Sequence, residues 1–120
     1  MAYRRTSENI ARVAKSLEGH HPYLRGAPSR LPFHWNTATI ERGLNFTLAT
    51  DLGPIDFLGE IAGGGSYDAL YAQSEPLHVF GIVCRCLTLE QLIKVKRAAG
   101  RPKDLEALAE LEAIAEERRR

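Results

Sequence analysis

Alternating apolar and polar residues in the first half of the chain constrain its fold more than any other feature. Leu44, Phe46 and Leu48 are separated by single polar or small residues, and the turn sequence Asp-Leu-Gly follows them. Such alternation is typical of a strand with one buried face, and a short turn containing glycine brings a second strand back beside it. The sequence therefore predicts a β-hairpin with strands at 44–50 and 54–60.

Helical patterns and a second hairpin surround the first hairpin. Ile10, Val13 and Leu17 share one face at the helical spacing, which predicts a helix over residues 6–17. The further elements expected are a helical turn at 37–42, a short helix at 67–72, a second hairpin at 77–87, a helix at 89–99 and a last helix after Asp104. This order predicts an α+β fold, with helices packed on a small mixed or antiparallel sheet, in a single domain spanning residues 1–120.

Two details of the C-terminal half are also predicted. Asp104 follows a link that contains proline, and we expect it to cap the last helix, whose apolar face runs from Leu105 to Ile114. Cys84 and Cys86 lie two apart in a strand, so they point to the same face and are poorly placed to bridge each other. We interpret them as reduced core residues, because the alternative, half of a metal site, lacks a second cysteine pair.

Composition excludes several broad classes of function. The chain has 120 residues and a formal net charge of +1, so no whole-protein field favours nucleic acid or acidic lipid. No apolar run approaches the roughly 18 residues that a membrane helix needs. The basic N-terminus has no apolar stretch after it, so it does not resemble a secretory signal. These features predict a cytoplasmic protein that has no membrane partner.

Asp56 is the first candidate site residue, since it interrupts an otherwise apolar strand, Ile-Asp-Phe-Leu. A carboxylate inside a strand costs free energy unless it is paired, hydrated or bound to a metal. Asp51 and Glu60 lie at the turn and at the strand end, so they cannot simply complete a ligand set with Asp56. We therefore interpret Asp56 either as a surface acid or as one member of a site.

A group of basic residues around one helix end is the second candidate site. Its members are Lys94, Lys96, Arg97, Arg101 and Lys103. Cations suit a helix C-terminus and a solvated helix face, which is one interpretation. The other interpretation is contact with a triphosphate or a nucleic acid, because lysine supplies a compact charge to phosphates.

Two further motifs do not support a site. The triple glycine before Ser66 lacks the lysine of a phosphate-binding loop, so we interpret it as a turn before a helix. The four histidines, His20, His21, His34 and His78, lack the repeated spacing of zinc ligands. They are therefore interpreted as loop and surface residues.

Five runs of sequence carry a resemblance to a known family. They are GLNF at 43–46, TDLGPIDFLGE at 50–60, GGSY at 64–67, LEQLIK at 89–94 and KRAAGRPKDL at 96–105, of which the last is the most specific. With these runs the chain resembles the small nucleotidyltransferase-fold proteins of bacteria, including those of toxin–antitoxin pairs. The resemblance implies the C-terminal part of that fold.

The family's activity is metal-dependent transfer of a nucleoside monophosphate from a nucleoside triphosphate to a hydroxyl. The resemblance places Asp56 at the third of three carboxylate positions. Several carboxylates must converge to hold two Mg²⁺ ions about 3.5–4 Å apart. The Gly-Ser turn and the D-x-D strand that carry the other two acids have no counterpart before Asp56. The resemblance is therefore to a relative that begins after that part.

Three hypotheses follow from these observations. The first is a truncated or degenerate nucleotidyltransferase-like domain that is not catalytic by itself and needs no cofactor. The second is an active, Mg²⁺-dependent enzyme whose metal site, including Asp56, is completed by another chain. The third is a non-enzymatic interaction module whose basic residues near Lys96 and Lys103 contact an acidic or nucleic-acid partner. Missing strands would expose a sheet edge, which favours a homodimer unless the loop at 20–36 masks that edge.

Overall fold

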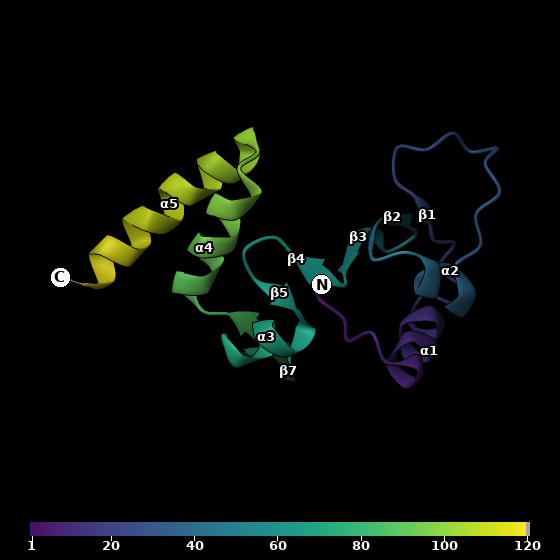
Figure 1. Ribbon diagram of the computed structural model, residues 1–120, viewed down its shortest axis with the longest axis horizontal. Helices are drawn as coiled ribbons and strands as arrows, with labels where there is room; N and C mark the ends of the chain where they lie inside the picture. Colours follow the sequence, from purple (N-terminus) through teal and green to yellow (C-terminus); the bar gives the residue numbers. More distant parts are fainter. Residues whose placement is uncertain (120) are drawn as a thin grey trace. The chain divides into compact units, whose positions relative to one another are not determined.

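The computed structural model describes residues 1–119 and shows an α+β protein with five helices and three small sheets (Figure 1). The α+β class predicted from the sequence is confirmed. The chain forms two compact units, Met1–Glu60 and Ile61–Arg120, called here the N-terminal unit and the C-terminal unit. Within residues 1–119, no helix is both long enough and apolar enough to cross a membrane.

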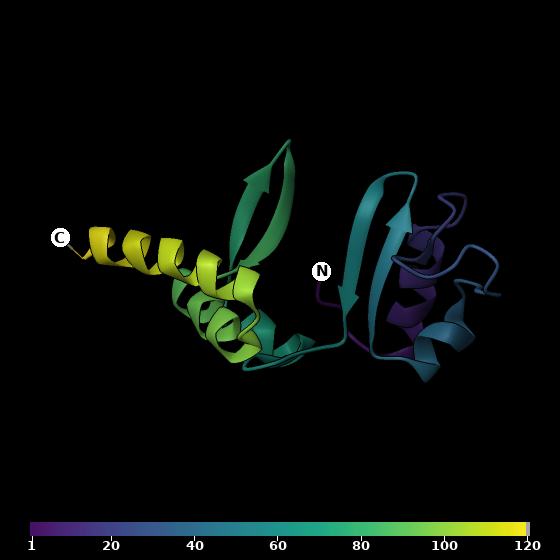
Figure 2. The same ribbon diagram turned by 90° about the horizontal axis from the view of Figure 1, so that it is seen from above.

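The N-terminal unit contains the first predicted hairpin and two helices. Its elements are α1 (Ser7–Ser16), β1 (Tyr23–Leu24), α2 (Thr37–Arg42), β2 (Asn45–Thr50) and β3 (Gly53–Leu58). Strands β2 and β3 pair antiparallel with Phe46 opposite Phe57, and the short β1 pairs with the other edge of β2. Helices α1 and α2 lie on one side of the hairpin (Figure 2). The predictions of this hairpin and of both helices are confirmed.

Alternation along β2 builds the core of the N-terminal unit. Phe46 and Leu48 are buried while Asn45, Thr47 and Ala49 are exposed, as a half-buried strand requires. Ile40 of α2 and Leu48 have no exposed surface at all. Trp35, from the proline-containing loop at 20–36, stacks on Phe57 with the ring centroids 5.7 Å apart. The loop therefore supplies part of this core.

The outer edge of β3 is covered by the first residues of the chain. The Leu58 amide donates to the Met1 carbonyl over 2.7 Å, and the Tyr3 amide donates to the Leu58 carbonyl over 3.0 Å. On the opposite side of the sheet, Tyr23 and Leu24 of β1 pair with the edge of β2. Both edges thus have some of their hydrogen-bonding groups occupied, which lowers their tendency to pair with another chain.

The C-terminal unit contains the second predicted hairpin and the two longest helices. Its elements are β4 (Glu60–Ile61), whose first residue belongs to the other unit, β5 (Gly65–Ser66), α3 (Tyr67–Ala72), β6 (Ser74–Val79), β7 (Ile82–Leu87), α4 (Leu89–Ala99) and α5 (Pro102–Arg118). Phe80 and Gly81 join β6 to β7 with φ angles of 50° and 76°. Two consecutive positive φ angles are typical of a type I′ hairpin turn.

The core of the C-terminal unit is small. Its buried apolar side chains are Leu70, Val95, Leu108 and Ala115. Leu105 and Ile114, expected on the buried face of the last helix, are 51% and 46% exposed. That expectation is wrong for these two residues, because only part of the apolar face of α5 packs on α4. The C-terminal unit therefore leaves apolar surface uncovered within the described chain.

Two other expectations for this unit are also wrong. Asp104 does not cap α5, because the helix begins at Pro102 and Arg101 occupies the N-cap position. Proline suits the first helical turn, where its missing amide hydrogen has no partner to lose. Cys84 and Cys86 are free and exposed rather than buried in a core, because no layer of the described residues covers their strand in this unit.

Candidate functional site

Asp56 lies on β3, opposite Thr47 of β2, with its side chain 44% exposed. The guanidinium of Arg25, just after β1, forms an ion pair with its carboxylate. The amino group of Met1 donates a hydrogen bond to the backbone carbonyl of Asp56 over 2.6 Å. Burial lowers the pKa of this amino group, and the Asp56 carboxylate opposes that change. Asp56 is thus the acidic member of a small surface cluster with two basic groups.

The surroundings of Asp56 do not fit a site for two Mg²⁺ ions. Such a site needs several converging carboxylates, whereas the groups beside Asp56 are a guanidinium and an amino group. Nearby positive charges disfavour a bound cation. Among residues 1–119, no three His, Cys, Asp or Glu side chains are grouped so that they could hold one metal ion. Completion of such a site would require acids from elsewhere and release of Arg25.

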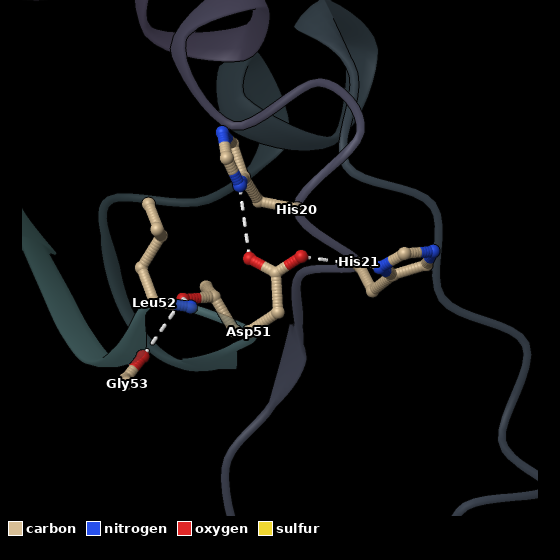
Figure 3. A network of polar contacts seen from close by, with 6 residues as sticks. His20, His21, Asp51, Leu52 and Gly53 are labelled. Carbon is tan, nitrogen blue, oxygen red and sulfur yellow. Dashed lines mark hydrogen bonds and ion pairs between the residues drawn. The ribbon is translucent and has the colours of Figure 1, made fainter.

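Asp51, a second acid of the hairpin, belongs to a separate network with two histidines (Figure 3). Its Oδ1 lies 2.9 Å from Nδ1 of His20, and its Oδ2 lies 3.5 Å from Nδ1 of His21. The Asp51 amide also donates to the His20 carbonyl over 3.0 Å. This network joins the segment after α1 to the β2–β3 turn.

Sequence reasoning treated His20 and His21 as scattered residues and missed this network. The available signal was local: two adjacent histidines follow Gly19 in the loop after α1, and an aspartate begins the hairpin turn. Only the antiparallel pairing of Tyr23 with Ala49 brings these distant segments together. The network connects two turns, so we interpret it as part of the scaffold.

The basic residues of the C-terminal unit are largely engaged within that unit. Asp104, with no exposed surface, accepts a hydrogen bond from Nε of Arg101 over 2.6 Å and one from Nζ of Lys96 over 3.3 Å. Arg97 of α4 pairs with Glu112 of α5 at 2.6 Å. These contacts join α4 to α5 and neutralise positive charge on the surface between them.

Asp104 is the strongly perturbed acid of this group. The hydrogen bond from Arg101 lowers the pKa of its carboxyl from 3.8 to about 2, burial opposes this shift, and Lys96 adds to it. A buried carboxylate that accepts charged donors remains ionised in this way. Lys96 and Arg101 are therefore held by Asp104, whereas Lys94 and Lys103 are exposed on α4 and in the first turn of α5.

The N-terminal unit also has a surface hollow of about 710 Å³ between α1 and the proline-containing loop. Leu17, Phe33 and Trp35 line it, with Lys15 and His34 at polar positions. Indole Nε1 of Trp35 is buried with no hydrogen-bond partner among the described atoms. More than half of the lining residues are apolar or glycine, so the hollow suits an apolar group better than a phosphate.

We expect Asp56→Asn to lower the free energy of unfolding of the N-terminal unit by at most about 1 kcal/mol. The Asp56–Arg25 pair is exposed on both sides, 44% and 39%, so water screens it. Urea denaturation followed by the fluorescence of Trp35, the single tryptophan, measures this change. Arg25→Gln and the double variant complete a cycle, and a coupling energy well above 1 kcal/mol would contradict a surface role.

Comparison of the chain with protein-family models, with curated protein sequences and with solved structures gives no significant match.

Proposed function

We propose that the chain is a nucleotidyltransferase-like domain that is not catalytic by itself and serves as an interaction module. The proposal rests on the resemblance of its five sequence runs to that family. The observation that carries it is the ion pair between Asp56 and Arg25, which occupies the carboxylate that the resemblance assigns to metal binding. An acid already neutralised by a guanidinium is poorly suited to hold a second cation.

The engagement of the basic residues supports the same proposal. Triphosphate transfer relies on positive charge positioned around the phosphates. Lys96 and Arg101 instead bind the buried Asp104, so their charge is engaged within the unit, and Lys96 joins α4 to α5. Lys94 and Lys103 are the members of this group best placed to contact a nucleotide or nucleic acid, because they are exposed.

We propose that the module acts as a homodimer. The sparse core of the C-terminal unit supports this, because Phe80 and Ile82 are 99% and 65% exposed. Exposed apolar patches mark interaction surfaces. Two free thiols, Cys84 and Cys86, are compatible with a reducing compartment such as the cytoplasm.

An active enzyme is the second candidate function. The side chain of Asp56 is 44% exposed, so acids of another chain could approach it. In that case Asp56 would be one Mg²⁺ ligand, and Arg25 would have to leave the carboxylate. The need to break this ion pair makes the non-catalytic proposal the better supported one.

We expect no nucleotidyl transfer from ATP, GTP, CTP or UTP to protein or RNA by the isolated chain. The physical reason is that a single, ion-paired carboxylate cannot position the metals that neutralise charge in the transition state. Incubation with radiolabelled triphosphates and Mg²⁺ or Mn²⁺ is the measurement. Asp56→Asn is the matched control, and labelling that depends on Asp56 would overturn the proposal in favour of an active enzyme.

A further inference from the structure

The β6–β7 hairpin has one mostly apolar face and one face of mixed character. Since strand side chains alternate, the register places Leu77, Val79, Ile82, Cys84 and Cys86 on one face, with Glu75 at its end far from the turn. Leu77 and Ile82 are 48% and 65% exposed. The hairpin extends away from α4 and α5, as its green ribbon in Figure 2 shows. Such a pattern is typical of a strand pair with one covered face, yet no described residue of the C-terminal unit covers this face.

The opposite face carries Arg85, which holds the hairpin within the unit. The Arg85 guanidinium lies 4.4 Å from the ring centroid of Tyr71, and its Nε donates to the Ser74 hydroxyl over 3.0 Å. The contact with Tyr71 links the hairpin to α3, the contact with Ser74 joins β7 to β6, and together they fix which face points away. The anchored hairpin can therefore present one edge and one face to a partner in a defined orientation.

The two edges of the hairpin differ in the backbone amide hydrogens that they present to a partner strand. In a hairpin with a two-residue turn, the two residues that flank the turn, here Val79 and Ile82, form a hydrogen-bonded pair. The next residue on each strand therefore has its backbone amide and carbonyl pointing away from the other strand, and so does every second residue after it. On β6 the outward positions include Pro76, which has no amide hydrogen. On β7 they are Val83, Arg85 and Leu87, all with amide hydrogens. Among the described residues only β6 pairs with β7, so the better edge is open.

We propose that two copies of the chain pair antiparallel through the β7 edge, with Cys84 opposite Cys84 across a two-fold axis. This inference rests on the homodimer of the proposed function and specifies its surface. The edges of the N-terminal sheet are less suited, since residues 1–3 and β1 pair with them. A second copy is the partner that by symmetry supplies an identical open edge.

Repulsion between like charges and the length of the paired segment both favour this register. With Cys84 opposite itself, Arg85 of one copy faces Val83 of the other, and Ile82 faces Cys86. A shift that places Arg85 opposite Arg85 sets like charges against each other, which is destabilising. A shift in the other direction runs past the Phe80–Gly81 turn and shortens the paired segment. The chosen register also brings the two apolar faces onto the same side of a four-stranded sheet.

The first test compares proline at two outward positions that face each other across the hairpin. Val83→Pro removes an outward amide hydrogen of β7, whereas His78→Pro removes one of β6, and neither takes part in pairing within the hairpin. Sedimentation velocity of the full chain, over concentrations up to hundreds of micromolar, measures self-association. We expect Val83→Pro to raise the dimer dissociation constant at least about tenfold and His78→Pro to leave it nearly unchanged.

The second test uses the cysteines and does not depend on a proline being tolerated. Cys86→Ser keeps Cys84, which in this register faces its own copy at a non-hydrogen-bonded position where side chains are closest. Mild oxidation should therefore crosslink Cys86→Ser into a disulfide dimer. Cys84→Ser keeps only Cys86, which lies opposite Ile82, and should crosslink far less.

Each outcome decides between this dimer and its alternatives. A monomer mass at every concentration, as would occur if another part of the chain covers the edge, overturns the proposal. A dimer that survives Val83→Pro but is lost with Ile82→Ser indicates packing through the apolar faces and also overturns it. Equal crosslinking of the two cysteine variants excludes the register. None of these outcomes depends on nucleotidyl transfer, so failure of the pairing and failure of the non-catalytic proposal are distinguishable.

Discussion

Replacing Leu48 with alanine is expected to lower the free energy of unfolding of the N-terminal unit by about 2–5 kcal/mol. Leu48 has no exposed surface, and it lies on the central strand opposite Leu24 of β1 and Ile55 of β3. Truncation removes buried contacts and leaves a cavity that strands on both sides cannot easily close. Urea denaturation followed by Trp35 fluorescence measures the loss, because Trp35 packs in the same core.

Leu52→Ala is the matched control for this prediction. Leu52 is the same residue type, lies in the turn of the same hairpin and is 64% exposed. We expect its replacement to change stability by no more than about 0.5 kcal/mol. Similar losses for the two variants would show that Leu48 is not the buried centre of this core.

Asp104→Asn is expected to lower the thermal midpoint of the C-terminal helices by several degrees, about 5 °C. The variant leaves Lys96 and Arg101 facing a neutral amide at a position with no exposed surface. Circular dichroism at the helical band follows this unit, which contains the two longest helices. Glu112→Gln is the control, because it removes an ion pair between the same helices that is exposed on both sides. An equal shift for both variants would contradict a special role for Asp104.

The contribution of Asp104 to the free energy of unfolding should also depend on pH in a defined direction. Its pKa in the folded protein is lowered from 3.8 to about 2, mainly by the hydrogen bond from Arg101. A lowered pKa means that the stabilisation is fully present above the unfolded pKa and is lost as pH falls through the folded one. The difference in stability between the wild-type chain and Asp104→Asn should therefore be constant above about pH 5 and shrink towards pH 2. A difference that grows on acidification would contradict this assignment.

Local patterns determined most of the secondary structure of this protein. The alternation that includes Phe46 and Leu48 predicted β2, and the spacing of Ile10, Val13 and Leu17 predicted α1, because a repeat of 2 or 3.6 residues is written into neighbouring positions. The predicted helix at 89–99 also ends where α4 ends, and Gly100 after it adopts the left-handed conformation that closes a helix. These features depend on a few adjacent residues, so they can be read without knowledge of the fold.

The partners of Asp56 and Asp51 were decided only by the tertiary structure. Asp56 meets Arg25, and Asp51 meets His20, across 31 positions of sequence in each case. Cys84 and Cys86 were expected in a core because their strand is apolar, yet their exposure depends on which layers exist to cover it. Asp104 lies three residues after Arg101, but its burial follows from the packing of α5 on α4. Burial and the ion pairs of Asp56 and Asp51 depend on segments that are distant in sequence, and no local repeat specifies how these segments meet.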